Sequence, residues 1–394
     1  MTKLETLIQQ LCPDGVEYKK LGKFATISRG GNFQKKDFKE SGVPCIHYGQ
    51  IYTKYGLFAE HTFTFISEDI APKQKHAESG DIVMAVTSEN IEDVCKCVAW
   101  LGKESAAVSG HTAIIHHNQN PKYLCYYFHS NHFQLQKKRL VHGTKVMEVT
   151  PSALNDITIP VPPLPVQEEI VRILDKFTEL TAELTAELTA ELTDRKKQYE
   201  YYRDFLLENA NDTRICYLNE LAENCDSQRK PVTSGNRVAG EYPYYGASGI
   251  VDYVNDYIFD GDYLLISEDG ANLLARNTPI AFSISGKNWV NNHAHVLHFD
   301  HYATRRYVEI YLNSIDLSPY ITGGAQPKLN QTNLNKIAIS LPSLPEQERI
   351  VAILDRFDAL CNDLTSGLPA EIEARQKQYE YYRDKLLTFK EKEI

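Results

Sequence analysis

The sequence predicts a mixed α/β (α+β) fold in which two similar globular domains are separated by two long antiparallel helices that form a coiled coil. Residues 159–180 and 339–360 are identical at 13 of 22 positions, and residues 195–207 and 375–387 at 11 of 13, always at an offset of 180. The segments that precede the two copies are largely different. A repeated frame around unlike inserts indicates two similar supports that present two different surfaces.

Length and composition are those of a globular protein with two or three domains. The chain has 394 residues, of which 42% are hydrophobic and 24% are charged, so each domain can bury its own core. No run of 18 apolar residues occurs, and the first residues lack the apolar stretch of a signal peptide. We therefore expect a cytoplasmic protein without a membrane span. Most of the net charge of −10 lies in the repeated frame, so the near-neutral inserts with their basic clusters are compatible with DNA contact.

The two inserts are expected to share one mixed α/β fold. Short apolar stretches at 81–86 and 262–266 are typical of strands. Several short matches between the inserts support a common fold. The matching residues are Gly80 and Asp81 with Gly261 and Asp262, Val108 and His111 with Val290 and His293, Gly143 with Gly323, and Leu154 and Asn155 with Leu334 and Asn335.

The first copy of the frame predicts a helix of about 40 residues over 166–207, with a length of about 60 Å. Prolines precede it, acidic residues lie in its first turn, and apolar residues recur at helical spacing without an intervening proline or glycine. Its apolar stripe needs a partner, which the second copy provides. Gly367 and Pro369 interrupt the second copy, so we expect a kink or a break there.

A low-complexity insert lies inside the first helix, where the tetrapeptide TAEL occurs three times in residues 181–192. Four residues advance about 400°, so leucines four apart drift by only about 40° and stay on one helix face. The insert is either an ordinary amphipathic helix or a spacer to which turns can be added. The spacer residues are Thr181, Leu184, Leu188 and Leu192. The expected domains are 1–158, 159–210 with the repeat helix and spacer, 211–338, and 339–394 with the C-terminal repeat helix.

The sequence contains no recognisable catalytic signature. Nucleotide-binding glycine motifs, HExxH, GxSxG and the tetrapeptide of amino-methylating enzymes are all absent. The eight cysteines include no CxxC pair, which favours reduced, buried thiols. His293 and His295 leave open an enzyme with a bound metal, although no acidic or cysteine partner stands at a recognisable spacing. We expect no catalytic residue, metal ligand or cofactor-binding residue in this chain.

Loops rich in glycine, amide, hydroxyl, aromatic and basic residues recur at matching places in both inserts. Such side chains suit base edges and phosphates, since Arg and Lys pair with guanine or phosphate, Asn and Gln with adenine, and Glu and Asp with cytosine. Each loop alone is compatible with a plain turn, but their recurrence favours binding. The side chains expected to contact DNA are Arg29, Lys35, Lys36, His47, Tyr48, Gln50, Asn90, Lys145, Arg229, Tyr244, Tyr245, Ser248, Glu268, Asn272, Asn292 and Lys328.

The repeated frame resembles that of a known family. The pattern Ile-x-x-Pro-x-Leu-Pro-x-Gln-Glu-x-Ile-Val-x-Ile-Leu-Asp-x-Phe, present twice, is similar to the specificity subunit of type I restriction–modification systems. The Gly-x-x-x-x-x-Leu-Asn run at 323–330 and the segment Tyr-Pro-Tyr-Tyr-Gly-Ala-Ser-Gly at 242–249 also fit. The resemblance covers essentially the whole chain.

The resemblance implies a non-catalytic subunit with two target-recognition domains, each of which reads one half of a split, asymmetric double-stranded DNA site. It also implies that the paired helices set the half-site separation and dock two adenine-N6 methyltransferase (M) subunits. S-adenosylmethionine would then be bound by those subunits, and ATP and Mg²⁺ by motor-nuclease (R) subunits. The alternative is a coiled-coil adaptor with two peptide-binding domains and no DNA affinity.

The helix residues expected to dock partners are more polar and aromatic than a buried helix seam requires. They are Gln167, Glu168, Tyr199, Tyr202 and Arg203 in the first copy, with Gln347, Glu348, Tyr379, Tyr382 and Arg383 in the second.

Overall fold

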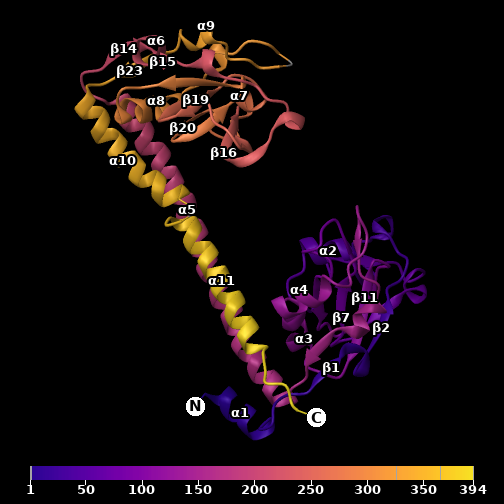
Figure 1. Cartoon of the computed structure of the whole chain (residues 1–394). Helices are drawn as coiled ribbons and strands as arrows, with labels where there is room; N and C mark the ends of the chain where they lie inside the picture. Colours follow the sequence, from indigo (N-terminus) through magenta and orange to yellow (C-terminus); the bar gives the residue numbers. More distant parts are fainter. Residues whose placement is uncertain (1, 325, 364, 394) are drawn as a thin grey trace. The chain divides into compact units, whose positions relative to one another are not determined.

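The computed structural model describes residues 2–324, 326–363 and 365–393. Ala325, in one of the loops expected to bind DNA, lies outside them. The chain forms two compact units, which we call unit 1 (Met1–Glu187 with Ile372–Ile394) and unit 2 (Leu188–Glu371) (Figure 1). One boundary between the units falls inside the TAEL insert. None of the described helices is both long enough and apolar enough to cross a membrane.

Unit 1 contains a four-stranded sheet of order β5-β3-β10-β6 and a five-stranded sheet of order β2-β11-β7-β9-β4. Its elements are α1 (Lys3–Leu11), β1 (Tyr18–Lys20), η1 (Leu21–Lys23), β2 (Ala25–Arg29), η2 (Lys35–Asp37), β3 (Val43–Ile46), α2 (Tyr48–Thr53), β4 (Phe58–Ala59), β5 (Thr64–Ile66), η3 (Ala71–Lys73), β6 (Lys75–Ala77), β7 (Ile82–Ala85), β8 (Thr87–Ser88), β9 (Cys97–Trp100), β10 (Ala106–Val108), β11 (Thr112–His117), α3 (Pro121–Phe128), α4 (Asn131–Lys137), β12 (Met147–Glu148), η4 (Ala153–Asp156) and β13 (Thr158–Pro160).

Unit 2 contains two four-stranded sheets, of orders β17-β16-β21-β18 and β15-β22-β19-β20. Its elements are β14 (Arg214–Tyr217), α6 (Leu218–Leu221), β15 (Glu223–Asn224), η5 (Asp226–Gln228), η6 (Ser234–Asn236), β16 (Ala239–Gly246), β17 (Gly249–Val254), β18 (Phe259–Asp260), β19 (Tyr263–Ser267), α7 (Asn272–Ala275), β20 (Ala281–Ile284), β21 (Lys287–Val290), β22 (Ala294–His298), α8 (Tyr302–Ser314), η7 (Ser318–Tyr320), α9 (Gln331–Leu334), β23 (Ala338–Leu341) and α10 (Leu344–Asn362).

The two units share the main strand order of their larger sheets, as the matches between the inserts predicted, and unit 1 adds β4 at one sheet edge. The parallel pair of β3 with β10 in unit 1 corresponds to the parallel pair of β16 with β21 in unit 2, and unit 1 has a further parallel pair, β4 with β9. Val108 and Val290 end the equivalent strands β10 and β21. Gly143 and Gly323 have φ angles of 110° and 85°, and a Cβ on either would collide with the carbonyl oxygen three residues ahead. The same left-handed turn therefore occurs in both units and requires glycine.

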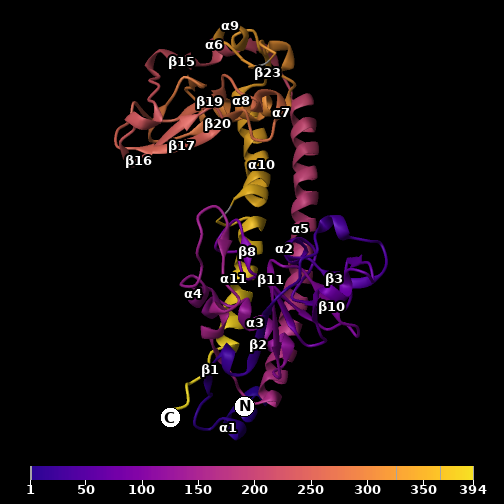
Figure 2. The same ribbon diagram turned by 90° about the vertical axis from the view of Figure 1, so that its right-hand side faces the viewer.

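The frame helix α5 (Leu164–Glu208) runs unbroken for 45 residues and confirms the predicted long helix. Its two parts are paired with α11 (Leu368–Leu386) in unit 1 and with α10 in unit 2 (Figures 1 and 2). In unit 1 Phe177 packs on Tyr382, and Thr178 lies 3.0 Å from the Tyr379 hydroxyl. As residue numbers rise along α5 they fall along α11, so the pair is antiparallel. The predicted break lies between Asn362 and Leu368.

Leu184, Leu188 and Leu192 of the TAEL insert are all half-buried, whereas the alanines and glutamates between them are exposed. The four-residue spacing therefore keeps one apolar stripe on α5, as the helical geometry predicted.

Two tyrosines on one helix hold each domain against the strand that leads into its frame helix. In unit 1 the hydroxyls of Tyr123 and Tyr127 donate to the carbonyls of Pro160 and Thr158, at 2.9 and 2.8 Å. In unit 2 the hydroxyls of Tyr307 and Tyr311 donate to the carbonyls of Ser340 and Ala338, at 2.9 and 3.5 Å. The acceptors are 180 residues apart, so the repeated frame presents the same backbone groups to both domains.

The repeated glutamine and aspartate of the frame complete this attachment. Gln167 and Gln347 each donate to a proline carbonyl five residues earlier, at 2.7 Å in both cases. Asp175 accepts from Lys122 and from a tyrosine hydroxyl of α3, and Asp355 accepts from Arg306 and from a tyrosine hydroxyl of α8. The repeated motif is thus a set of domain–helix contacts.

The Gln167→Ala variant is expected to lower the free energy of unfolding by about 1–3 kcal/mol, because it leaves the buried Pro162 carbonyl and the Asn120 N–H without their partners. Glu168→Ala, at the neighbouring exposed position, should change that free energy by less than about 0.5 kcal/mol. Denaturant unfolding followed by circular dichroism measures both. Equal effects of the two substitutions would show that the Gln167 amide does not hold the helix start.

Candidate nucleic-acid interface

The loop between β10 and β11 is the centre of the candidate interface in unit 1. Gly30 and Gly31 cross it so closely that a Cβ on Gly30 would lie 2.0 Å from the Ser109 carbonyl. The Arg29 guanidinium donates to the Gly110 carbonyl at 3.0 Å and forms an ion pair with Glu148. The backbone N–H of Tyr48 donates to the Ser109 hydroxyl at 2.9 Å. Four chain segments distant in sequence therefore meet here.

A row of rings joins this loop to α2. The Tyr48 ring lies 4.6 Å from the His47 ring and 5.0 Å from the His111 ring, and Phe38 meets His47 edge-on. His47 is 6% exposed, and burial, with smaller contributions from Lys35 and His111, lowers its pKa to about 4. Its imidazole is therefore neutral at pH 7 and accepts from the Gly49 N–H as an N-cap.

The remaining unit 1 candidates divide into exposed and internal groups. Lys35, Lys36 and Lys145 are exposed and are available to phosphates. Asn90 is exposed, but both ends of its amide bond Asp93. Gln50 is 7% exposed and bonds Thr64 and the His47 N–H. Burial of Gln50 and His47 corrects the expectation that their side chains face a ligand, because both hold the start of α2.

In unit 2 a buried ionic network occupies the matching place. Arg229 donates to Glu268 at 2.6 Å and to the Ala294 carbonyl at 2.7 Å. His295 bonds Asp226 through Nδ1 and the Leu329 carbonyl through Nε2. Burial raises the pKa of Glu268, but Arg229 and Lys328 outweigh it, and the net shift is downward. Arg229 and Glu268 are therefore committed to each other, which corrects their assignment as DNA contacts; Lys328 pairs with Glu268 from an exposed position.

The two histidines that the sequence left open as metal ligands bond different carboxylates. His293 pairs with Asp269 at 2.9 Å, and His295 pairs with Asp226 at 2.6 Å. Asp226, Glu268 and His295 lie close enough to hold an ion, but Arg229 and Lys328 already neutralise this group.

The aromatic and amide candidates of unit 2 also divide by exposure. Tyr244 is 1% exposed, and its hydroxyl bonds the Val232 backbone, so its assignment to base readout is wrong. Tyr245 is half-buried against Phe282, and the Asn272 amide is tied to the Thr278 backbone. Ser248, in the turn between β16 and β17, and Asn292, in the loop after β21, are exposed.

His111 and His293 were not among the predicted contacts, although both are exposed at equivalent places in the two units. Each stands three residues after the valine that ends the parallel strand, in the loop at the centre of its candidate interface. The shared Val-x-x-His pattern was the signal, and it indicated common structure without indicating a role.

The docking candidates are partly internal. Gln167 and Gln347 are 0% and 3% exposed, so the expectation that they lie on an exposed helix surface is wrong. Glu168 and Glu348 are exposed, Tyr199 and Tyr379 are half-buried, and Arg203 and Arg383 pair with the aspartate that follows each of them. Tyr202 and Tyr382 are 43% and 41% exposed.

Each unit has an exposed aromatic patch on its helix pair. The unit 1 patch is Phe177, Leu180, Tyr381 and Tyr382, and the unit 2 patch is Leu360, Tyr201, Tyr202 and Phe205, with the half-buried Phe357 beneath Tyr202. Phe205 is 49% exposed, and the repeat places Lys385 at the equivalent position. The two patches are therefore similar but not identical.

Comparison with known proteins identifies the class. A family model for the type I restriction modification DNA specificity domain matches residues 13–194 and 212–374, so the chain belongs to this family.

Related sequences carry the same designation. A putative type I restriction enzyme specificity subunit of Haemophilus influenzae is 43% identical over 178 residues, which are 44% of this chain and 46% of that protein. The match therefore spans about half of the relative's length. A putative type I specificity subunit of Mycoplasma pneumoniae is 33% identical over 251 residues, which are 60% of this chain and 98% of that protein. The EcoR124I/EcoR124II specificity subunit of Escherichia coli is 37% identical over 261 residues, covering 59% of this chain and 63% of that protein.

Known structures share the fold. A chain from a structure on complex assembly and conformational transition of the type I restriction–modification system has a TM-score of 0.63 at 19% identity, covering 96% of this chain and 98% of that one. The HsdS subunit of Thermoanaerobacter tengcongensis has a TM-score of 0.52 at 17% identity, covering 96% and 97%.

Acidification from pH 6.5 to 4 is expected to destabilise the protein, in part through His47. The unfolded imidazole takes up a proton near pH 6.5, whereas the folded one does so only near pH 4, so the stability is present above pH 6.5 and falls through this window. His47→Asn keeps an N-cap acceptor but cannot titrate. Unfolding free energies measured across this window should therefore fall less steeply for His47→Asn than for the unmodified chain. Burial also lowers the pKa of His117 to about 4, so the His47→Asn variant should still lose some stability as the pH falls. If the variant and the unmodified chain lose the same stability over this window, His47 does not have the proposed role.

Proposed function

We propose that this chain is the DNA sequence-recognition subunit of a type I restriction–modification complex, in which each domain reads one half of a split, asymmetric site. The observation that carries the proposal is one fold and one frame used twice with unlike interface residues. Unit 1 has an aromatic row and an exposed Arg29–Glu148 pair where unit 2 has a buried ionic network. Two equivalent surfaces of different chemistry suit two different half-sites better than one repeated ligand.

Exposed cations near the candidate interface of each unit are the proposed phosphate contacts. Lys35, Lys36 and Lys145 in unit 1 and Lys328 in unit 2 are all exposed, while Arg29 is half-exposed beside the central loop. Arg29, His111 and Tyr48 converge on one loop, which favours them for base contacts in unit 1. Asn292, His293 and Ser248 are the proposed counterparts in unit 2. The family match, and not the cations alone, favours this assignment over a peptide-binding adaptor.

The Lys35→Ala variant is expected to weaken DNA binding to all sequences alike and to reduce the slope of log K against log salt by about 1, because one phosphate contact is lost. Lys197→Ala removes an exposed lysine from α5 and serves as the control. Fluorescence anisotropy with a labelled duplex at several salt concentrations measures both slopes. If the two variants have the same slope as the unmodified chain, Lys35 does not contact a phosphate.

The TAEL insert is the proposed spacer between the half-sites. One tetrapeptide adds about 6 Å to a helix, against about 3.4 Å per base pair of DNA. A change of one tetrapeptide therefore does not correspond to a whole number of base pairs, and DNA bending must take up the remainder. The half-buried leucine stripe supports the proposal, because adding or removing one TAEL preserves the helix face that packs.

Deleting residues 181–184 is expected to shorten the recognised spacer and to leave both half-sites unchanged. Mapping methylated adenines in a host that carries the complete system gives both halves and their separation. Altered half-site bases would contradict the spacer role, and so would an unchanged separation. Exchange of residues 1–155 with those of a relative is the matched control, since it should change one half-site and keep the separation.

The aromatic patches on the helix pairs are the proposed docking surfaces for two methyltransferase subunits. Tyr201, Tyr202, Tyr381 and Tyr382 expose large rings without covering a core, and such rings are common at the centres of protein interfaces. In this arrangement the partner subunits supply catalysis, with S-adenosylmethionine on the methyltransferases and ATP with Mg²⁺ on motor-nuclease subunits. The chain itself contributes recognition and spacing.

A further inference from the structure

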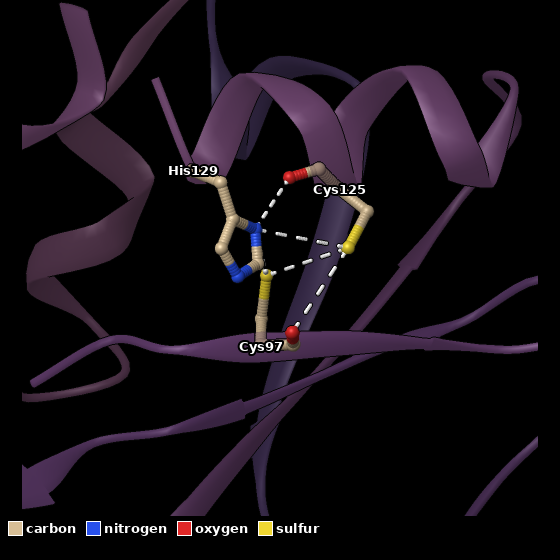
Figure 3. A group of neighbouring side chains, drawn as sticks. All are labelled: Cys97, Cys125 and His129. Atoms are coloured by element: carbon tan, nitrogen blue, oxygen red, sulfur yellow. Dashed lines mark hydrogen bonds between the residues drawn. The ribbon is translucent and has the colours of Figure 1, made fainter. Parts of the chain in front are cut away.

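Three ligand-type side chains meet in the interior of unit 1, away from the candidate nucleic-acid interface. Cys97 lies on β9, Cys125 lies on α3, and His129 caps the C-terminus of α3. The two sulfur atoms are 3.9 Å apart, and His129 Nδ1 lies 3.9 Å from the Cys97 sulfur and 4.0 Å from the Cys125 sulfur (Figure 3). The three donor atoms thus form a nearly equilateral triangle.

The size of this triangle suits a metal ion. An ion at its centre would lie about 2.3 Å from each donor, which is the usual Zn–S distance and close to the Zn–N distance in proteins. Two thiolates and an imidazole are ligands of zinc and not of Mg²⁺ or Ca²⁺. Cys97 and Cys125 are 2% and 0% exposed, whereas His129 is half-buried, so two of the three ligands are shielded from solvent.

The charge of the site selects a divalent ion. Two thiolates and one neutral imidazole carry a charge of −2, so a divalent cation gives a neutral site and a monovalent one leaves a buried charge. The site also lies at the C-terminus of α3, where the helix dipole favours a cation.

Proton balance is simple at this site. In the free protein His129 Nδ1 donates to the Cys125 carbonyl at 2.8 Å, and the Cys125 thiol donates to the Leu57 carbonyl at 2.9 Å. Binding releases one proton from each thiol to solvent. The imidazole proton moves from Nδ1 to Nε2, and the ring turns Nδ1 from the Cys125 carbonyl toward the ion, so the hydrogen bond to that carbonyl is exchanged for a metal bond and the ring stays neutral.

The equivalent place in unit 2 shows what such a site would do. The paired tyrosines align α3 with α8, so that Cys125 corresponds to Glu309 and His129 corresponds to Asn313. Asn313 bonds the N–H groups of Ile280 and Ala281 and the Ala281 carbonyl, and Glu309 accepts from Ser283 of β20. Unit 2 therefore connects its domain helix to the edge strand by hydrogen bonds at the place where unit 1 has metal-ligand side chains.

We propose that Cys97, Cys125 and His129 bind one Zn²⁺ ion that connects α3 to β9 of the five-stranded sheet. In unit 1 the ion serves the purpose that hydrogen bonds serve at the equivalent place in unit 2. It fixes α3, whose Tyr123, Lys122 and Tyr126 contact the frame. It is a structural ion of the first domain only. This inference is independent of what the chain recognises.

Metal analysis of the full-length chain tests the proposal directly. The chain, purified without chelator and supplied with Zn²⁺, is expected to retain about one ion per chain, and Co²⁺ in its place should give the strong near-ultraviolet absorption of thiolate-to-cobalt charge transfer. Cys125→Ala and His129→Asn should each weaken Zn²⁺ binding at least about 100-fold. Cys95→Ala removes another buried cysteine outside the cluster and should bind as the unmodified chain does.

A substitution can lower stability by itself, so each variant is also unfolded by heat with and without Zn²⁺, and the change in unfolding temperature on adding Zn²⁺ is compared. The unmodified chain and Cys95→Ala should unfold at a higher temperature with Zn²⁺, whereas Cys125→Ala and His129→Asn should show no rise. The proposal is overturned if the unmodified chain retains no Zn²⁺, if Co²⁺ gives no charge-transfer band, or if Cys125→Ala binds Zn²⁺ as tightly as Cys95→Ala. DNA binding is not needed for any of these measurements, so their failure would leave the recognition function untouched.

Discussion

The rest of the structure depends on one set of hydrogen bonds. Two tyrosines on the domain helix of each unit, α3 in unit 1 and α8 in unit 2, donate to the strand that leads into the frame helix. The tyrosines belong to the divergent inserts, but their acceptors are backbone carbonyls of the repeated frame. A backbone carbonyl is present whatever the side chain, so one frame can hold two domains of unlike sequence. Gln167 and Gln347 fix the start of each frame helix. About three turns further on, Asp175 and Asp355 each accept from a cation and from a tyrosine hydroxyl.

This arrangement explains why the architecture could be predicted from the sequence. The repeat offset, the long uninterrupted helix pattern and the interruption at Gly367 are local or periodic signals, and the structure confirms each of them. The contacts of Asp175 and Asp355 were not predicted. Their partner cations lie on helices of the inserts, and the two insert helices correspond to each other at a sequence offset that differs from the offset of the frame. A single sequence shows that a residue is repeated, but it does not show which surface needs it.

The candidate interface was predicted less well, for a physical reason. Polar and aromatic residues in glycine-rich loops serve equally well as ligand contacts and as internal supports of the loop. Gln50, Tyr244, Arg229 and Glu268 prove to be supports, because each has its hydrogen-bonding groups satisfied by neighbours distant in sequence. Lys35 and Asn292 remain exposed. Burial distinguishes the two roles, and it depends on the tertiary packing of the inserts, where no repeat guides the alignment.

The first and last residues of the chain complete unit 1 together. The Val16 N–H donates to the Lys390 carbonyl at 2.8 Å, the Lys392 N–H donates to the Val16 carbonyl at 3.0 Å, and residues 372–394 belong to the same compact unit as residues 1–187. Unit 2 is one continuous segment of the chain, whereas unit 1 is built from two segments that flank it. On the ribosome, the last residue of unit 2 is therefore added before Lys390 and Lys392, whose backbone groups unit 1 needs to pair with Val16.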